Sequence, residues 1–472
     1  MLTYDLVVLG SGPAGEKGAA TAAAFGKRVA IVESDPYVGG ASTNTGTLPS
    51  KTLRETALAL SGLRARDLYG VDLSLRREAT VGDFLYHENR VKNKERGRVL
   101  DTLHRGQVDL HRGYGSFLDP HTITVLDLDG NTTTLRAEKV LIATGSSPIR
   151  PPEFRFEDPR IHDSDEILSL EKLPRTLAVI GAGVIGAEYA CTFAALGAKV
   201  YLLDGRDILL PFLDREISEA LVASLERSGI QFHRREKVLR CDDSHEDFID
   251  LVCESGFHLQ VDQVLVAAGR RSNTEKLNLP AAGISPGPKG LISVDKCYRT
   301  SAPHIYAAGD VIGFPALAST SAEQARVAMC HAFDFGFRFN MGPLLPTGIY
   351  TIPEVSMIGE TEEALREKEI EYVAGRASYA DNARGEIIGD TSGFLKLLFR
   401  KSDMKLLGAH AIGEQATELI HIGLVAMMTN SGAELFDHTC FNYPTLGDLY
   451  KVAAYDALLS PLRASHSGAA LP

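Results

Sequence analysis

Residues 4–33 read YDLVVLGSGPAGEKGAATAAAFGKRVAIVE, which is an apolar strand, a glycine-rich turn, an alanine-rich helix and a second apolar strand. Gly10 permits the tight turn, Gly12 lets the backbone approach a pyrophosphate at the helix N-terminus, and Gly15 lets helix and strand pack closely. Glu33 ends the second strand, where an acid meets ribose hydroxyls. The residues predicted to bind a dinucleotide here are Gly10, Gly12, Pro13, Ala14, Gly15, Glu33 and Ser34. A glycine-rich turn in any α/β protein is the alternative, but the flanking strand, helix and acid favour binding.

The same pattern of strand, glycine-rich turn, helix and strand recurs over residues 177–204. The distance from the first glycine to the terminal acid is 23 residues in both copies, from Gly10 to Glu33 and from Gly181 to Asp204. Each copy also closes on a similar strand, at residues 140–145 and 264–269. The additional predicted binding residues are Thr144, Gly145, Gly181, Gly183, Gly186, Asp204 and Gly269. Two bound redox dinucleotides suggest electron transfer between them.

Composition narrows the class of protein. The 472 residues suffice for about three domains. A net charge of −12 argues against nucleic acid or an anionic membrane as a partner, and the basic run at residues 90–98 is better explained as a solvated helix face. The apolar stretch 177–203 belongs to the second nucleotide motif, so no membrane span is predicted. Six scattered cysteines indicate neither a zinc site nor a disulfide framework, and the chain enters a strand without a signal peptide pattern. We therefore expect a cytoplasmic protein without a metal.

The segment after the first motif carries a family resemblance. Residues 38–51 read VGGASTNTGTLPSK and are followed by a helical pattern that begins near Thr52. With their surroundings, these residues resemble the flavoprotein disulfide reductases over nearly the whole chain. The resemblance implies an α/β fold with two Rossmann-like, glutathione-reductase-like dinucleotide-binding domains and an α+β C-terminal interface domain. Ser42 and Thr47 stand where that family has its redox cysteines. A hydroxyl cannot form the disulfide, so the sequence excludes thiol reductase chemistry.

The same resemblance implies the catalytic and flavin-binding residues. Lys51 stands where the family places a lysine beside the flavin, and Glu188 is its expected partner; the lysine charge would tune the cofactor. Taken alone, Lys51 would be explained as a surface lysine and Glu188 as a helix glutamate. Their joint placement relative to the two glycine motifs favours a functional pair instead. Residues 300–310 match the family's second FAD motif, in which Asp310 would hold the ribityl chain. The FAD-binding residues implied in this way are Gly40, Ser42, Lys51, Gly309, Asp310, Leu317 and Ala318.

The end of the second motif bears on the choice of nicotinamide nucleotide. Asp204 would accept the ribose hydroxyls of NAD(H) and repel the 2′-phosphate of NADP(H). Arg206 follows closely and could pair with that phosphate, or it could be a solvated surface residue. The sequence leaves both alternatives open.

The C-terminal part lacks a further residue of thiol chemistry. Residues 441–448 read FNYPTLGD, and Tyr443 replaces the family's histidine, so no base acts there near neutral pH. Together with residues 46–51 and 207–216, this segment is similar to the soluble, Si-specific pyridine nucleotide transhydrogenases. Those enzymes usually keep a cysteine at the position of Ser42, and this chain departs there.

The resemblance implies hydride transfer between NADPH and NAD⁺ through FAD in a homodimer or higher homo-oligomer. The alternatives are an NAD(P)H:acceptor oxidoreductase that uses a quinone or oxygen, and a non-catalytic flavin-binding regulatory protein. The predicted division is 1–155 and 276–345 for FAD, 156–275 for NAD(P), 346–460 for dimerisation and 461–472 for a flexible tail. The proline-rich residues 146–159 are expected to link the FAD and NAD(P) domains.

Overall fold

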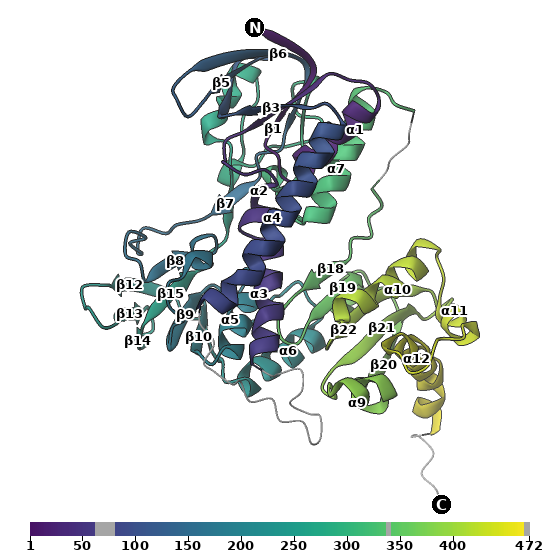
Figure 1. The fold of residues 1–472 in the computed structure, drawn as a ribbon. Coiled ribbons are helices and arrows are strands. Elements are labelled where there is room, and N and C mark those ends of the chain that lie inside the picture. Colours follow the sequence, from purple (N-terminus) through teal and green to yellow (C-terminus); the bar gives the residue numbers. More distant parts are fainter. Residues whose placement is uncertain (62–80, 337–340, 467–472) are drawn as a thin grey trace, which may run out of the picture.

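The computed structural model describes residues 1–61, 81–336 and 341–466. Two regions with parallel sheets are followed by a region with an antiparallel sheet, which confirms the predicted fold class. We call these the N-terminal, inserted and C-terminal regions. Figure 1 shows them around a central column of helices, with the N-terminal region at the top. Among the described residues, no helix combines the length and apolar character that a bilayer span requires.

The N-terminal sheet has a parallel core in the order β3-β2-β1-β6-β17, and β5 and β4 extend it in antiparallel fashion beside β6. Its strands are β1 (Leu2–Leu9), β2 (Val29–Glu33), β3 (Asp109–Arg112), β4 (Tyr114–Asp119), β5 (Thr122–Leu126), β6 (Thr132–Ile142) and β17 (Ile305–Ala307). Because β17 pairs with β6, the chain returns to this sheet after the inserted region, as the sequence predicts.

Strand β1 is buried on both faces, which explains its unbroken apolar run. Leu6 and Val8 pack in one core cluster with residues of the helices, and Val7 and Leu9 pack in another on the opposite face. The helices of this region are α1 (Pro13–Ala24), α2 (Gly40–Asn44), α3 (Thr47–Leu60), α4 (Val81–Arg105) and α7 (Ala318–Ala332). Most of the basic run at residues 90–98 lies on α4 and is at least partly exposed, as expected.

Helix α3 begins at Thr47, whereas the sequence suggests a start near Thr52. Pro49 lies within its first turn. A proline is tolerated there because the first N–H groups of a helix have no intrahelical partner. The earlier start places Lys51 within the helix rather than before it.

The inserted region has a fully parallel sheet in the order β11-β10-β9-β15-β8. A separate three-stranded antiparallel sheet, β12-β13-β14, packs beside it. The strands are β8 (Ile161–Asp163), β9 (Thr176–Ile180), β10 (Lys199–Asp204), β11 (Gln231–Arg234), β12 (Val238–Asp242), β13 (Ile249–Cys253), β14 (His258–Val261) and β15 (Gln263–Val266), and the helices are α5 (Val184–Ala195) and α6 (Arg215–Arg227).

The two chain crossings between the N-terminal and inserted regions pair with each other. Strands β7 (Ser146–Pro148) and β16 (Arg270–Ser272) form a two-stranded antiparallel ribbon, with Arg270 opposite Pro148. The proline-rich segment from Ser146 to Pro159, expected to be a linker, therefore begins with a short strand. Single-turn 3₁₀ helices lie in the loops of the chain: η2 (Glu166–Ser169), η3 (Glu275–Leu277), η4 (Leu279–Ala282), η5 (Pro288–Gly290), η6 (Asp310–Ile312), η7 (Tyr379–Asp381) and η8 (Leu446–Asp448).

The C-terminal region is an antiparallel sheet in the order β18-β19-β22-β21-β20, covered by helices. Its strands are β18 (Thr347–Ile349), β19 (Val355–Gly359), β20 (Tyr372–Ser378), β21 (Phe394–Arg400) and β22 (Leu406–Ile412), and its helices are α8 (Glu362–Glu367), α9 (Ala383–Ile388), α10 (Ala416–Met428), α11 (Ala433–His438) and α12 (Leu449–His466). Helix α12 continues through residues 461–466, where a flexible tail was expected; residues 467–472 lie outside the described part.

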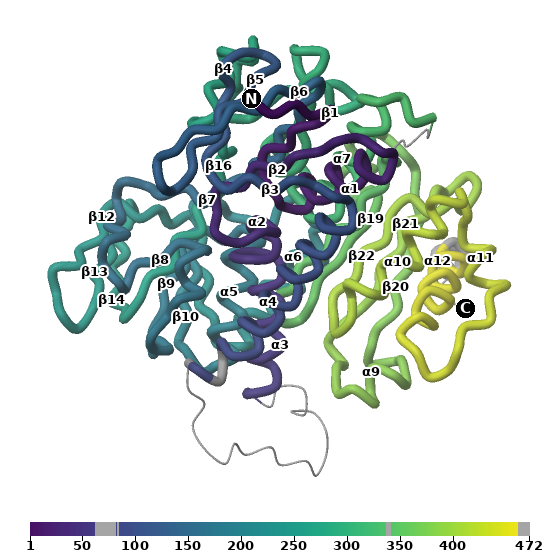
Figure 2. Tube along the Cα trace, turned by 45° about the horizontal axis from the view of Figure 1, so that its top comes forward, coloured from purple at the N-terminus to yellow at the C-terminus, as the bar shows by residue number. Residues whose placement is uncertain are grey.

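A buried cluster of charges joins the inserted and C-terminal regions. Lys396 on β21 is 2 % exposed, and its ammonium lies 2.7 Å from Asp214, 2.9 Å from Glu216 and 3.1 Å from Glu362. Asp214 is fully buried and caps α6 by accepting the Glu216 N–H. Arg376 on β20 adds a second cation beside Glu216, at 2.7 Å. Figure 2 shows α6 close to the C-terminal sheet, where this cluster forms.

Candidate functional site

The first glycine-rich turn has the geometry that a pyrophosphate requires. Gly10 has φ +99°, and a side chain there would collide with the Ala143 carbonyl, since its Cβ would lie 2.4 Å from the oxygen. A Cβ on Gly15 would lie 1.9 Å from the Gly10 carbonyl oxygen, so only glycine allows α1 to approach the turn. No side chain caps the N-terminus of α1 at Gly12. Its free N–H groups and the positive end of the helix dipole therefore face the turn.

Glu33 lies buried beside this turn and is fixed by three donors. The Ser11 N–H and hydroxyl donate to Oε2 at 2.9 and 2.5 Å, and the Asp35 N–H donates to Oε1 at 2.9 Å. A carboxylate accepts about four hydrogen bonds, so Oε1 retains capacity for a ribose hydroxyl. Ser34 follows at the strand end and is partly buried.

The second predicted FAD motif meets the first. A Cβ on Gly309 would lie 3.3 Å from the Ala14 Cβ, so the two motifs touch. Asp310 accepts a hydrogen bond from the Ser146 hydroxyl at 2.7 Å, and α7 begins at Ala318, directly after Leu317, without a side-chain cap.

Two further features near the first turn suit a ligand. The hydroxyl of Thr144, next to Gly145, is buried without a hydrogen-bond partner in the described part of the chain. Gly40 packs so closely that its Cβ would lie 2.8 Å from the Gly12 Cα. An unsatisfied buried hydroxyl and a backbone cradle beside a free helix N-terminus fit a bound dinucleotide.

The second glycine-rich turn has nearly the same backbone distances as the first. Gly181 has φ +102°, and its Cβ would lie 2.5 Å from the Ala267 carbonyl oxygen. A Cβ on Gly186 would lie 1.9 Å from the Gly181 carbonyl oxygen, and α5 begins after Gly183 without a side-chain cap. Gly269 follows the closing strand with φ +106°. The predicted internal repeat is thus a repeat of three-dimensional geometry.

Arg206 is exposed at the end of β10, and its guanidinium pairs with the carboxylate of Asp204. Its Nε donates to Asp204 Oδ1 at 2.9 Å and its Nη2 donates to Oδ2 at 2.8 Å. The Ala182 N–H donates to the same carboxylate at 2.6 Å. Burial alone would raise the pKa of Asp204, but the hydrogen bonds from Arg206 and Ala182 hold that pKa below its usual range. Arg206 remains half exposed and so can contact a ligand.

Lys51 and Glu188 are brought together across 137 residues, as the resemblance implies. Lys51 Nζ donates to Glu188 Oε2 at 2.6 Å, with Lys51 on α3 and Glu188 on α5. Glu188 is 6 % exposed and Lys51 is 26 % exposed, so the carboxylate is held in the protein while the ammonium remains accessible. This pair lies where the N-terminal and inserted regions meet.

Hydroxyl side chains occupy the two positions at which the family has its redox cysteines. Ser42 is on α2 and Thr47 begins α3, and all six cysteines of the chain are free. Cys191 lies on α5 near Glu188, but burial raises the pKa of its thiol to about 12. Tyr443, at the expected histidine position, is 74 % exposed in this chain.

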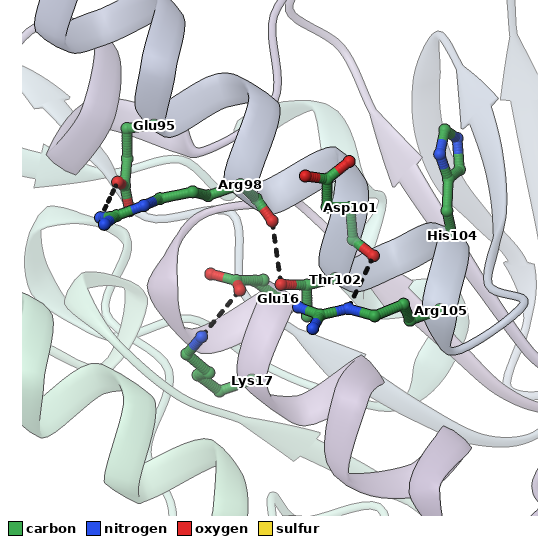
Figure 3. Close-up of a pocket in the computed structure, with 8 residues that line it drawn as sticks. All are labelled: Glu16, Lys17, Glu95, Arg98, Asp101, Thr102, His104 and Arg105. Carbon is green, nitrogen blue, oxygen red and sulfur yellow. Dashed lines mark hydrogen bonds and ion pairs between the residues drawn. The ribbon is translucent and has the colours of Figure 1, made fainter.

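A surface groove of about 590 Å³ lies between α1 and α4, apart from these residues. Figure 3 shows two ion pairs in it, each formed within one helix: Lys17 pairs with Glu16 at 2.7 Å on α1, and Arg98 pairs with Glu95 at 2.9 Å on α4. No residue predicted from the sequence lines it. We therefore assign the groove no part in the candidate site.

Three residues of the site were missed by the sequence analysis. Ser11 lies inside the first motif and Arg270 directly follows Gly269, so their positions offered a signal. Arg270 donates to the Ser146 hydroxyl at 2.8 Å and thus supports Asp310. Tyr350, whose N–H donates to Glu188 at 2.9 Å, is 162 residues from its partner, and nothing local in the sequence points to it.

Comparison with known families covers most of the chain. Residues 4–331 match the family model described as "Pyridine nucleotide-disulphide oxidoreductase". Residues 345–454 match the model "Pyridine nucleotide-disulphide oxidoreductase, dimerisation domain".

Several curated proteins are similar over nearly their full length. A protein of Mycobacterium tuberculosis named "Soluble pyridine nucleotide transhydrogenase" is 45 % identical over 459 residues, covering 97 % of this chain and 98 % of that protein. Proteins of the same name are 43 % identical in Pseudomonas putida and 40 % identical in Colwellia psychrerythraea, each covering 96 % of this chain and 98 % of the relative.

Solved structures share the fold. LpdA from Mycobacterium tuberculosis superposes with a TM-score of 0.89 at 26 % identity, covering 96 % of this chain and 99 % of that one. The "HOCl-induced flavoprotein disulfide reductase RclA from Escherichia coli" gives 0.86 at 28 % identity, covering 95 % and 100 %.

Proposed function

Because this chain belongs to the pyridine nucleotide-disulphide oxidoreductase family, we propose that it is an FAD-dependent transhydrogenase that transfers hydride between NADPH and NAD⁺. The observation that carries the proposal is the Lys51–Glu188 pair, which joins α3 to α5, the helix that follows the second glycine-rich turn. Ser42 and Thr47 stand in place of the family's thiol pair. The relatives that are 40–45 % identical bear the name of this activity.

The residues of the first motif fit FAD. The free N-terminus of α1 suits the pyrophosphate, Glu33 suits the adenosine ribose, and the unpartnered Thr144 hydroxyl and Asp310 suit the rest of the cofactor. When bound, FAD supplies the group that accepts hydride from one nicotinamide and donates it to another. Lys51 would place a positive charge beside that group, and Glu188 orients the ammonium.

The residues of the second motif would hold either nicotinamide nucleotide. Asp204 suits the ribose hydroxyls of NAD(H), and Arg206, already bound to Asp204, can turn toward the 2′-phosphate of NADP(H). Hydride transfer between nicotinamides needs no proton donor on the substrate. The absence of a histidine at Tyr443 is consistent with that requirement.

The proposal includes the division of the chain into residues 1–155 and 276–345 for FAD, 156–275 for NAD(P) and 346–460 for a dimerisation domain. A family model of a dimerisation domain supports a homodimer. Six free cysteines suit a reducing compartment, and we propose the cytoplasm.

Transhydrogenation is expected to follow ping-pong kinetics at one nicotinamide site. Only the second turn remains for nicotinamide once the first is assigned to FAD, so donor and acceptor must take turns. Initial rates for varied NADPH at several fixed concentrations of a spectrally distinct NAD⁺ analogue should give parallel lines in double-reciprocal form. Converging lines, or a complex that holds both nicotinamides, would contradict this prediction. Rapid reduction of a quinone without transfer to the analogue would favour the acceptor oxidoreductase instead.

Reduction by NADPH is expected to stop at two electrons per flavin. No dithiol accompanies the flavin, since Ser42 and Thr47 replace the cysteines. An anaerobic titration followed by absorbance measures the stoichiometry, and prior alkylation of the protein is the control and should leave it unchanged. Uptake of four electrons would show that a second redox centre has been overlooked.

A further inference from the structure

Tyr350 of the C-terminal region contacts both members of the Lys51–Glu188 pair. The two oxygens of Glu188 are occupied from opposite sides: Lys51 Nζ donates to Oε2 at 2.6 Å, and the backbone N–H of Tyr350 donates to Oε1 at 2.9 Å. Tyr350 directly follows β18, so the edge of the C-terminal sheet sets the position of this N–H. The carboxylate therefore cannot rotate away from Lys51 without losing a second hydrogen bond.

The side chain of Tyr350 contacts the other member of the pair. Lys51 Nζ lies 5.0 Å from the centroid of the Tyr350 ring, within the range of a cation–π contact. Lys51 Nζ also donates to the Ser50 hydroxyl at 3.3 Å. The ammonium is thus held by a carboxylate, a hydroxyl and an aromatic face, while 26 % of the side chain remains exposed.

The segment that carries Tyr350 is itself fixed to the helix that carries Lys51. Arg54, one turn after Lys51 on α3, is 2 % exposed and donates through Nε to the Thr351 carbonyl at 3.0 Å. Its Nη1 lies 3.3 Å from Glu354. Glu354 in turn accepts the Thr417 hydroxyl at 2.7 Å, from the first turn of α10. The contacts form a closed ring from Lys51 through Glu188, Tyr350 and Thr351 to Arg54 on the same helix.

We propose that Tyr350 is a positioning residue for hydride transfer, which fixes the Lys51 ammonium through its ring and Glu188 through its N–H. The inference rests on the proposed function, because it concerns the same pair. It adds a contribution from the C-terminal region, which supplies no other contact to Glu188 among the hydrogen bonds of the described residues. Burial raises the pKa of the Tyr350 phenol, so the ring acts as a neutral aromatic face rather than as a proton carrier.

The test uses the FAD-loaded full chain with a graded series at position 350. Tyr350→Phe keeps the aromatic face, Tyr350→Leu removes it, and mono-, di- and trifluorophenylalanine weaken its negative potential with little change of shape. The matched control is Tyr114→Leu, because Lys276 lies 4.3 Å from the Tyr114 ring in an equivalent contact between β4 and η3. Measurements are the flavin midpoint potential, the rate of flavin reduction by NADPH without an acceptor, and modification of Lys51 by an amine reagent, followed by mass spectrometry.

We expect Tyr350→Phe to match the wild type in all three measurements. Tyr350→Leu should slow flavin reduction by roughly threefold to tenfold, speed modification of Lys51 by a similar factor and make the midpoint potential more negative, because a cation–π contact holds the charged ammonium in place. The fluorinated residues should fall between these limits in order of fluorine number. If Tyr350→Leu does not fold, the fluorinated series still tests the cation–π contact, because fluorinated phenylalanines preserve the packing.

Lys51 reactivity and midpoint potential that stay constant along the fluorinated series would overturn the inference. Equal changes in Tyr350→Phe and Tyr350→Leu would overturn it as well, since the ring would then be irrelevant. Failure of the proposed function would be seen separately, as a wild type that is reduced by NADPH but does not pass hydride to an NAD⁺ analogue.

Discussion

Replacement of Lys396 by methionine should lower the free energy of unfolding by about 3–5 kcal/mol. Lys396 is the cation that lies between the carboxylates of Asp214, Glu216 and Glu362, and Asp214 is fully buried. Methionine matches the length of the side chain but leaves the Asp214 charge without its nearest partner in a site that excludes water. Urea unfolding of the purified protein, followed by circular dichroism, measures the loss.

Two further variants separate the buried charge from the loss of a side chain. Lys401→Met removes an exposed lysine that pairs with Glu371 at 3.3 Å, and it should cost less than about 1 kcal/mol. Asp214→Asn combined with Lys396→Met should be less destabilised than Lys396→Met alone, because asparagine removes the unpaired charge and still caps α6. A double variant as unstable as the single one would mean that packing, not charge, is responsible.

The effect of Lys396→Met should depend on pH in a defined direction. Burial alone would raise the pKa of Asp214, but His410 and Lys396 hold it below its usual range, so its contribution is present above about pH 4 and is lost as the pH falls through the lowered value. The pKa of Lys396 is raised by Asp214 and Glu216 despite burial, so its contribution persists until the pH exceeds that raised value. The difference in free energy of unfolding between the wild type and Lys396→Met should therefore be largest from about pH 5 to pH 9 and should become smaller in acid.

The second large effect concerns nucleotide choice at the end of β10. Asp204→Ala should weaken NAD(H) binding by about 1.5–3 kcal/mol, the usual loss for a charged hydrogen bond, and leave NADP(H) unchanged or tighter. The reason is that the same change releases Arg206, which Asp204 binds through two hydrogen bonds. Arg206→Ala should weaken NADP(H) selectively. Isothermal titration of each variant with both nucleotides measures the four affinities.

The Ala182 N–H complicates this comparison, because Asp204 also holds the second glycine-rich turn. Asp204→Asn keeps an oxygen for that N–H and removes only the charge, so it separates turn geometry from selectivity. Arg215→Ala, on the exposed face of α6, is the control for loss of an arginine and should change neither affinity. Equal losses for both nucleotides in the Asp204 and Arg206 variants would show that this strand end does not distinguish the 2′ position.

The glycine-rich turns could be predicted in detail from the sequence because their determinants are local. An apolar strand, three glycines and a terminal acid lie within about thirty residues, and Gly10 and Gly181 adopt nearly the same positive φ. The start of α3 was predicted too late, because a proline in the first turn of a helix looks the same in sequence as a proline before it. Arg206 was two residues from its partner, but the sequence does not show that a long side chain folds back onto its own strand end.

Contacts between regions could not be predicted from composition or periodicity. Lys396 lies in FLKLLFR, a strand whose apolar run gives no sign that its lysine is buried, and its partner Asp214 is 182 residues away. Tyr350 likewise meets Glu188 only because the C-terminal sheet packs against α5. Such pairs depend on how whole sheets pack against other parts of the chain. The Lys51–Glu188 pair could be inferred because the family resemblance implies it.

The ribbon formed by β7 and β16 brings the two ends of the inserted region together. Arg270 lies opposite Pro148 in the antiparallel register, so the two points where the chain leaves and re-enters the N-terminal region are only about 5 Å apart. A two-residue turn spans that distance, and joining the strands there would leave the N-terminal sheet, including β17, uninterrupted. The inserted region is therefore an addition to the chain path at one hairpin, and the path of the N-terminal region on either side of it is the same with or without it.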